Sequence, residues 1–362
     1  MKALIIGPFP PLRGGISDFN YELVNELEKN CLIDVVGFKI NYPTFLRSKN
    51  KQIHQNNILK KSKSYINPYN PFDWFRIKKL VKKNKYNFVI STYWTPITGL
   101  CYYFINNFIG KNSKKIGLFH NLIPHEKFVF SELILKKFLK NLDKTVTLSK
   151  YNHHILEEKY NSKSLNLYHP INNVKTVSKE ESLNFLKLDK KYEYILFFGL
   201  VRKYKGLDIL LNSIKDIKSV KKNIKLIIAG EFIENIKNYK KMINSLGINN
   251  DVIIKNEFIN SDEIKFYFGA CELVVQPYKK ATQSGVSSLG IAYGKKIVTT
   301  NVGGLTEYLN EKNSFISKTN SKSLTNKIID AFNDQTSEKT KNIRKLQDEL
   351  SWNNFCKKLL KF

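Results

Sequence analysis

The sequence predicts an α/β protein made of two successive parallel-sheet domains. Short apolar runs, typical of strands buried on both faces, alternate with amphipathic helical stretches. A chain of 362 residues also exceeds what one hydrophobic core usually supports. A polar run with little expected structure, residues 171–190, separates two strand–helix series. These observations together favour two doubly wound domains.

The first series is assigned to residues 1–175 as an N-terminal Rossmann-like domain. Helical periodicity is clearest at residues 17–28 and 149–160. Strands are expected where apolar runs stop at glycine, serine or a turn. The expected strands are 3–7, 33–37, 88–91, 115–119 and 145–148.

The second series is assigned to residues 176–348 as a C-terminal Rossmann-like domain. It repeats the same alternation and ends in helices from residue 321 onward. A last helix begins at Trp352, within a terminal segment of residues 349–362. The expected strands are 194–199, 225–230, 252–255, 273–276 and 296–300.

The chain is strongly positive but contains few arginines. The formal net charge is +29, and only five of the 60 basic residues are Arg. Nucleic-acid binders favour Arg for bidentate contacts, so a nucleic-acid partner is not expected. A compositional bias would spread lysine over solvated faces without any function. Residues 49–85, however, mix basic residues with aromatic ones, which predicts contact with an anionic membrane surface. The aromatic residues are Tyr65, Tyr69, Phe72, Trp74 and Phe75, followed by Tyr86.

The cysteines and the apolar runs predict a cytoplasmic protein. Cys31, Cys101, Cys271 and Cys356 show no C-x-x-C spacing, so reduced and mostly buried thiols are expected, with no metal site. The apolar run at 97–109 is too short to span a bilayer, and the MKALIIGPFP start lacks the features of a signal peptide.

The most informative segment is residues 274–307, VVQPYKKATQSGVSSLGIAYGKKIVTTNVGGLTE. It predicts a strand, a polar loop, a helix, a second strand and a glycine-rich turn. A polar loop that leads into a helix directs free N–H groups and the positive end of the helix dipole toward a ligand, commonly a phosphate. An ordinary βαβ crossover would look similar. Tyr278 and Glu307 border these loops, and either could be structural.

Two further loops follow the first strand of each domain. Gly14 and Gly15 open the first helix, where glycine lets a ligand approach the backbone. Arg202 and Lys205 lie in the corresponding loop of the second domain, and Arg13 precedes the two glycines. A plain turn with solvated charges is the alternative. Because arginine is scarce here, its placement on these two loops favours a diphosphate ligand held between the domains.

These motifs resemble the GT-B glycosyltransferases of the retaining family 4 type, also called glycosyltransferase group 1. The resemblance covers essentially the whole chain. It rests on GGI, FHNLIPHE, GLVRKYKGLDILL, LIIAGE, the 274–307 segment and the closing SWNNFCKKLLKF. It implies two Rossmann-like domains facing a central cleft, with residues 349–362 returning to the first domain. It also implies a nucleotide-diphosphate sugar as donor and generally no metal or other cofactor.

The resemblance also assigns roles to individual residues. Arg202 and Lys205 match the basic pair that neutralises the donor diphosphate, and His120 matches the histidine that reaches the donor sugar. Its expected donor-binding residues are Gly15, Gln283, Ser284, Gly285, Val286, Glu231 and Phe258. Its expected acceptor-side residues are Arg13, Gly14, His125 and Glu126.

The chain departs from the family pattern at two glutamates that normally contact the donor sugar and the ribose. Counting back from Gly294 places them at Ala281 and Leu289, so both carboxylates are absent. A subgroup of the family carries loops similar to ATQSG, in which Gln283 would take over sugar contacts. Without a carboxylate nucleophile, a same-face displacement assisted by the leaving diphosphate is the mechanism that remains.

The histidines allow other interpretations. His120, His125 and Glu126 could bind a metal, or the imidazoles could simply cap a loop. His153 and His154 are adjacent on an expected helix and so point to different faces.

Three functions therefore stay open. The first is a glycosyltransferase that extends a cell-surface polysaccharide or a lipid-linked saccharide. The second is a non-catalytic partner subunit of a glycosyltransferase complex, which binds a nucleotide sugar or another transferase. The third is a GT-B epimerase, which would need carboxylates that the ATQSG loop lacks.

Overall fold

The computed structural model describes residues 1–12, 14–40, 62–122, 130–281 and 284–362. The chain divides into two compact units. Unit 1 contains Met1–Pro170 together with Trp352–Phe362, and unit 2 contains Ile171–Ser351.

Unit 1 is built on a seven-stranded sheet in the order β3-β2-β1-β4-β5-β6-β7, in which every neighbouring pair is parallel. The order reverses direction at β1, which is the mark of a doubly wound sheet. The strands are β1 Lys2–Gly7, β2 Leu32–Phe38, β3 Ser62–Ile66, β4 Phe88–Tyr93, β5 Lys114–Phe119, β6 Lys144–Thr147 and β7 Ser164–Asn166.

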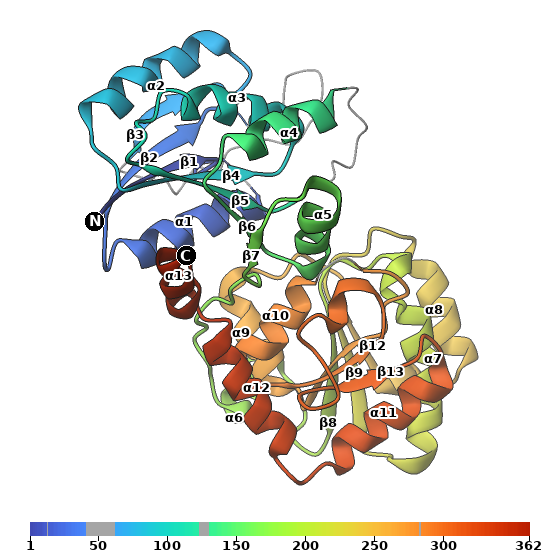
Figure 1. The fold of residues 1–362 in the computed structure, drawn as a ribbon. Helices are drawn as coiled ribbons and strands as arrows, with labels where there is room; N and C mark the ends of the chain where they lie inside the picture. Colours follow the sequence, from blue (N-terminus) through green and yellow to red (C-terminus); the bar gives the residue numbers. More distant parts are fainter. Residues whose placement is uncertain (13, 41–61, 123–129, 282–283) are drawn as a thin grey trace. The chain divides into compact units, whose positions relative to one another are not determined.

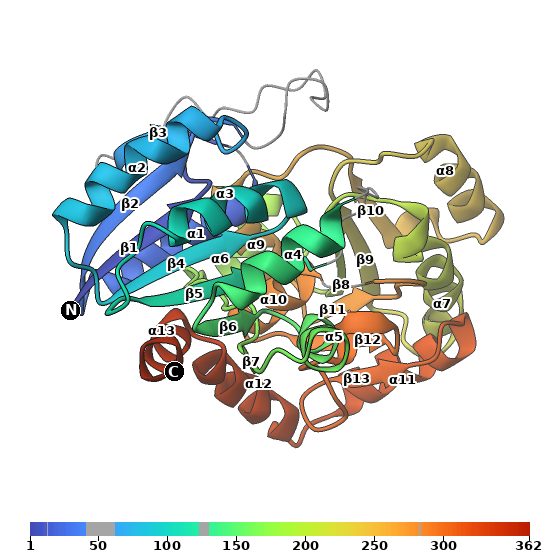
Figure 2. The same cartoon turned by 45° about the horizontal axis from the view of Figure 1, so that its top comes forward.

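Helices cover both faces of this sheet (Figure 1). The helices α2 Pro71–Lys83, α3 Pro96–Asn106, α4 Ser131–Lys140 and α5 Lys150–Tyr160 contribute apolar side chains to one core. On the opposite face, α1 Gly15–Leu27 and α13 Trp352–Lys361 lie side by side (Figures 1 and 2) and share a second core with β1 and β4. Residues from both ends of the described chain thus complete one unit.

Unit 2 has a six-stranded sheet in the order β10-β9-β8-β11-β12-β13, again with parallel neighbours throughout. The strands are β8 Glu193–Phe198, β9 Ile224–Ala229, β10 Val252–Lys255, β11 Leu273–Gln276, β12 Lys296–Thr300 and β13 Phe315–Ser317. The larger helices are α6 Lys179–Leu186, α7 Leu207–Val220, α8 Ile236–Ser245, α9 Ser261–Ala270, α10 Gly285–Ala292, α11 Ser321–Asn333 and α12 Glu338–Glu349.

All ten expected strands are present within a few residues of their expected limits. The prediction of a structure-poor run at 171–190 is wrong, because α6 forms there. Ser178 caps this helix by accepting a hydrogen bond from Glu181 N over 3.0 Å. The Ser-x-x-Glu spacing is a capping-box signature that the sequence already contained.

Three edge or short strands, β3, β7 and β13, were not predicted. The four cysteines are free and buried, as expected.

Candidate functional site

Lys205 is a buried cation at the carboxyl edge of the unit 2 sheet. It ends a single 3-10 turn, Lys203–Lys205, which follows β8, and it is only 7% exposed. Its Nζ lies 3.5 Å from Phe198 O and 5.5 Å from the centre of the Tyr278 ring. Among the described residues, no carboxylate forms an ion pair with it. A buried charge normally requires a partner, so Lys205 has unused capacity for an anion.

The 3-10 turn is held in place by the close approach of Gly206 to the end of β11. Gly206 has φ +69°, and a Cβ there would lie 1.9 Å from Pro277 O. Only glycine tolerates both this backbone conformation and this distance. The contact brings Lys205 against Tyr278, which follows Pro277 in sequence.

Burial, together with a smaller contribution from the nearby positive charge of Arg202, lowers the pKa of Lys205 to about 8. Arg202 itself is exposed, and its carbonyl accepts a hydrogen bond from Lys205 N over 2.9 Å. Lys205 is therefore still mostly protonated at neutral pH, beside a second cation. The two residues that were predicted as a pair do lie together.

The N-terminus of α10 lies beside the Lys205 ammonium. A Cβ on Gly199 would be 3.1 Å from Lys205 Nζ and 3.6 Å from Val286 Cγ2. Ser284 caps α10 by accepting a hydrogen bond from Val286 N over 3.2 Å. Gly285 is the first helical residue, and a Cβ built on it would meet no atom within 4 Å. Free N–H groups, a helix dipole and a buried ammonium therefore converge on one open surface.

Two loops at the same sheet edge carry Glu231 and Phe258. Glu231 follows β9 and is exposed, and its carbonyl accepts a hydrogen bond from Val201 N over 2.8 Å. Phe258 follows β10, and 73% of it is exposed. A solvent-exposed phenyl ring on this edge has room to stack against a planar ligand.

In unit 1, His120 follows β5 and is held by a hydrogen bond from its backbone N–H to Tyr93 O over 2.9 Å. Its ring meets the Phe19 ring edge-on, with centroids 4.7 Å apart. The Nε2 atom is buried and has no hydrogen-bond partner among the described residues. Burial lowers the pKa of His120 to about 3, with a smaller contribution from His169. The imidazole is therefore neutral at physiological pH.

His169 is a neighbour of His120 that the sequence did not reveal. Its ring packs on the same Phe19 ring, at a centroid distance of 5.0 Å, and its Nδ1 lies 3.1 Å from Pro170 O. Burial also lowers the pKa of His169. The sequence shows only a histidine before a proline, and no pattern links it to a residue near the end of β5.

Gly14 and Gly15 begin α1 at the carboxyl end of β1, as expected. Gly14 has φ +135°, and a Cβ on either glycine would meet no atom within 4 Å. The predictions for Arg13, His125, Glu126 and Gln283 concern positions outside the described residues. Within the described part of the chain, no group of three or more His, Cys, Asp or Glu side chains is arranged to hold a metal ion.

The family comparison matches the part of the chain that carries this unit 2 site. The model of the family described as "Glycosyl transferases group 1" matches residues 178–347. This matched segment, just under half of the chain, is here called the group 1 domain. The segment includes Lys205, Ser284 and Glu231, so the family domain and the geometric site coincide.

A sequence relative extends the similarity beyond this glycosyl transferases group 1 domain. An uncharacterized glycosyltransferase of Methanocaldococcus jannaschii is 27% identical over 371 residues, covering 97% of this chain and 95% of the relative. These matches support a glycosyltransferase. Assignment to family 4 in particular stays a prediction.

Solved structures show the fold of the whole chain. Anabaena HepE in complex with UDP is 14% identical, with a TM-score of 0.73 over 100% of this chain and 99% of that chain. A glycosyltransferase from Rickettsia africae is 19% identical, with a TM-score of 0.70 over 99% of this chain and 97% of that chain. The predicted GT-B fold, with its two parallel-sheet α/β domains, is confirmed.

Within the group 1 domain, backbone contacts and packing occur where the family pattern has glutamates. Ala281 O accepts a hydrogen bond from Gly304 N over 3.1 Å, in the glycine-rich turn Gly303–Thr306. Leu289 is partly buried against the core that contains Phe198 and Val286. Neither position can supply a carboxylate, so the charge in the site comes from its basic residues.

Proposed function

We propose that this protein is a glycosyltransferase that binds a nucleotide-diphosphate sugar at the carboxyl edge of the unit 2 sheet. The observation that carries the proposal is Lys205, a buried ammonium with no acidic partner among the described residues, beside the open N-terminus of α10. A diphosphate would satisfy both the ammonium and the helix N–H groups. The acceptor in this proposal is a saccharide or a lipid-linked saccharide of the cell envelope.

Two comparisons support the choice of ligand. The group 1 domain spans the residues of the site. Structures of Anabaena HepE, which shares the fold, hold UDP, UDP with glucose, and UDP-glucose. We therefore infer a nucleoside diphosphate sugar for this chain, and we propose that the exposed Phe258 ring and Glu231 contact its nucleoside.

The proposed chemistry retains the anomeric configuration and needs no metal. The bond between the anomeric carbon and the diphosphate oxygen breaks while the acceptor oxygen bonds to the same face of that carbon. The acceptor hydroxyl gives its proton to the leaving phosphate. Arg202 and Lys205 stabilise the negative charge that develops on the diphosphate. This mechanism requires no carboxylate nucleophile, in agreement with the absence of a carboxylate at Ala281 and at Leu289.

In this proposal the N-terminal unit contributes His120 and the Gly14–Gly15 turn. The unpartnered Nε2 of His120 belongs to a neutral ring, which can exchange hydrogen bonds with sugar hydroxyls. Gln283 is the proposed sugar contact from the polar loop, and Arg13, His125 and Glu126 are proposed on the acceptor side.

The first test is calorimetric titration of UDP, GDP, ADP and dTDP into the protein without metal. We expect one of them to bind selectively, and Lys205→Gln to weaken that binding by about tenfold or more, since hydrogen bonds to charged groups contribute about 1.5–3 kcal/mol. Lys203→Gln is the matched control, because Lys203 lies in the same 3-10 turn but is exposed. Equal affinities for the wild type and Lys205→Gln would refute the site.

A second candidate function is a non-catalytic subunit that binds a nucleotide sugar. The two missing carboxylates at Ala281 and Leu289 are the observation that favours it. Incubation with the selected nucleotide sugar and an acceptor extract separates the two functions. Release of free nucleoside diphosphate together with a glycosylated acceptor supports the transferase, whereas tight binding without turnover supports the subunit.

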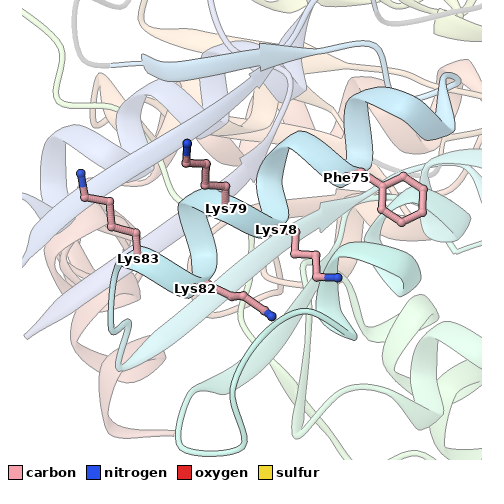
Figure 3. Close-up of a pocket in the computed structure, with 5 residues that line it drawn as sticks. All are labelled: Phe75, Lys78, Lys79, Lys82 and Lys83. Atoms are coloured by element: carbon pink, nitrogen blue, oxygen red, sulfur yellow. The ribbon is translucent and has the colours of Figure 1, made fainter.

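We also propose that helix α2 contacts an anionic membrane surface from the cytoplasmic side. Phe72 and Phe75 are 83% and 58% exposed on this helix. Phe75 and four lysines line a hollow of about 590 Å³, with Lys79 and Lys83 extending to one side of the helix and Lys78 and Lys82 to the other (Figure 3). Lysine heads around aromatic rings suit anionic headgroups above acyl chains.

Not every aromatic residue predicted for this surface is available. Trp74 and Tyr86 are 5% and 4% exposed and belong to the unit 1 core, so that part of the prediction is wrong. They point inward because α2 is amphipathic and places Trp74, Ile77 and Val81 on its buried face. In the described residues, no helix combines the length and apolar character needed to cross a bilayer.

Vesicle co-sedimentation tests this surface. We expect wild-type protein to bind vesicles with phosphatidylserine but not phosphatidylcholine alone, and the triple variant Lys78→Gln, Lys79→Gln, Lys82→Gln to lose most of that binding. Each lysine near an anionic surface contributes about 1 kcal/mol. Lys237→Gln, Lys240→Gln, Lys241→Gln is the charge-matched control on α8, where all three are exposed. If both triple variants lose binding equally, overall charge rather than α2 is responsible.

A further inference from the structure

Gln276, the last residue of β11, is a completely buried amide whose side chain bonds to two serines at the start of α10, the N-cap Ser284 and Ser287. Its Nε2 donates to Ser284 Oγ over 2.8 Å, and its Oε1 accepts from Ser287 Oγ over 2.9 Å. The other residues of the strand, Leu273–Val275 in sequence, are all apolar. An apolar side chain would therefore suit the strand, and burying an amide is costly unless its hydrogen bonds are made.

The hydrogen bonds of Ser284 explain what the amide does. A hydroxyl has one proton and two acceptor lone pairs. Ser284 Oγ accepts from Val286 N over 3.2 Å and from Gln276 Nε2 over 2.8 Å. With both lone pairs engaged, its remaining capacity is to donate. Tyr278 Oη, at 3.4 Å, is farther than a normal hydroxyl–hydroxyl bond. A ligand oxygen at a normal hydrogen-bond distance would therefore compete with Tyr278 for the Ser284 proton.

We propose that Gln276 is a positioning residue of the diphosphate site, which acts by holding the Ser284 hydroxyl as a hydrogen-bond donor. In the described residues, the N-terminus of α10 and the neighbouring Lys205 then present three donors, namely the Ser284 hydroxyl, the Gly285 N–H and the Lys205 ammonium. Such a surface favours an anion over a cation. This inference rests on the proposed nucleotide-sugar site, and it explains a residue to which that proposal gives no role.

Without the amide, the Ser284 hydroxyl loses this constraint. One lone pair of Ser284 Oγ is freed, so the hydroxyl can rotate and use its proton within the protein. A diphosphate would then have to reorient the group on binding. Preorganised donors bind more tightly than donors that must reorient. Gln276 should therefore affect ligand affinity, and it should do so only while Ser284 is present.

A double-mutant cycle on the full chain tests this dependence. The dissociation constant of the selected nucleoside diphosphate is measured by calorimetry for wild type, Gln276→Met, Ser284→Ala and the double variant. We expect Gln276→Met to weaken binding by about tenfold and the double variant to bind no more weakly than Ser284→Ala alone. A purely structural role would instead give additive losses. Additive losses would therefore overturn the proposal.

Two further variants show whether a loss of affinity arises from poor packing or from the removal of any buried hydroxyl. Gln276→Leu provides a second apolar replacement if the methionine packs poorly, and circular dichroism melts show whether each variant is folded. Ser213→Ala is the matched control, since Ser213 is also buried in unit 2, where its hydroxyl lies within hydrogen-bond distance of Ile209 O on α7 and Ser321 O on α11. This control should keep the wild-type affinity.

The failure of this inference can be told apart from the failure of the proposed function. If wild-type protein binds no nucleoside diphosphate, the proposed site falls and the inference falls with it. If wild-type protein binds one and folded Gln276→Met and Gln276→Leu bind it equally well, only the role of Gln276 is refuted.

Discussion

Lys205 shows how far a residue can differ from its sequence neighbours. Three basic residues occur within Arg202–Lys205, and nothing in their order distinguishes them except the family resemblance. In the structure Arg202 and Lys203 are exposed, whereas Lys205 is buried and has a lowered pKa. The difference arises from the tight turn at Gly206, which presses Lys205 against Tyr278, and such a close approach is not visible in composition or periodicity.

The affinity for nucleoside diphosphate should fall as pH rises from 7.5 to 9.5. The pKa of Lys205 is about 8 in the free protein. A bound diphosphate favours the protonated lysine, so above pH 8 binding must first take up a proton. We expect an affinity loss on the order of tenfold over this range. Phosphate groups titrate near pH 6 and contribute little here.

Calorimetry in two buffers of different ionisation enthalpy measures this proton uptake directly. Lys205→Arg keeps its charge throughout the range, so its affinity should change much less with pH. In the free wild-type protein, the free energy of unfolding changes with pH in the opposite direction to the affinity. The unfolded chain keeps the Lys205 proton above pH 8, so the cost of burying this charge decreases as pH rises toward 10.5. A pH-independent affinity in the wild type would exclude Lys205 as the diphosphate ligand.

At the scale of elements, burial on both faces made the central strands predictable. β1, β4, β8 and β11 are nearly continuous apolar runs with helices on each side, so their sequences alone indicate them. β3, β7 and β13 have only one strand neighbour each, and β7 and β13 are three residues long. Such short edge strands form because a neighbouring strand offers hydrogen bonds. The local sequence pattern does not show whether such a neighbour is present.

The helix α6 was missed for a different reason. The helix contributes little to the core, since Leu183 is its one apolar residue among the buried core residues. The helical pattern of apolar residues in its sequence is therefore weak. The capping interaction of Ser178 was the usable signal. Likewise, α10 was predicted from the polar loop before it, but the buried amide of Gln276 on β11 was not connected to it.

The glycine-rich turn behind the polar loop should tolerate no side chain at Gly303. Gly303 has φ +48°, and a Cβ there would lie 1.8 Å from Ala281 O. We expect Gly303→Ala to lower the free energy of unfolding of unit 2 by about 1–3 kcal/mol. Urea denaturation measures the loss. Gly110→Ala, where a Cβ meets no atom within 4 Å, should change stability far less. Equal stability of the two variants would contradict the close approach.

At the scale of the whole molecule, unit 1 depends on the helix α13. Phe355 and Trp352 of this helix are 4% and 9% exposed, and both rings pack on Phe19 of α1. The resemblance implied a returning helix, whereas periodicity alone predicted only that a helix begins at Trp352. Which sheet face receives such a helix is set by tertiary packing, and local sequence carries no record of it.

Phe355→Ala should destabilise unit 1 by about 3–5 kcal/mol, the usual cost of removing a buried phenyl ring. Hydrogen exchange resolved by segment measures it, and faster exchange is expected in α1 and β1 but not in β8 or β9. Phe75→Ala is the control, because that ring in the same unit is 58% exposed. Uniform acceleration in both units would contradict the assignment of α13 to unit 1 alone.

The discontinuity of unit 1 has a consequence during translation. Residues 1–170 are synthesised before unit 2, yet the side chains of α1 that pack against α13 stay uncovered until residues 352–362 follow. Unit 2 is one uninterrupted segment and can finish folding in between. Most of unit 1 is thus synthesised before unit 2 but is completed after it, so a chain stalled after Ser351 exposes apolar side chains of α1 to chaperones and proteases.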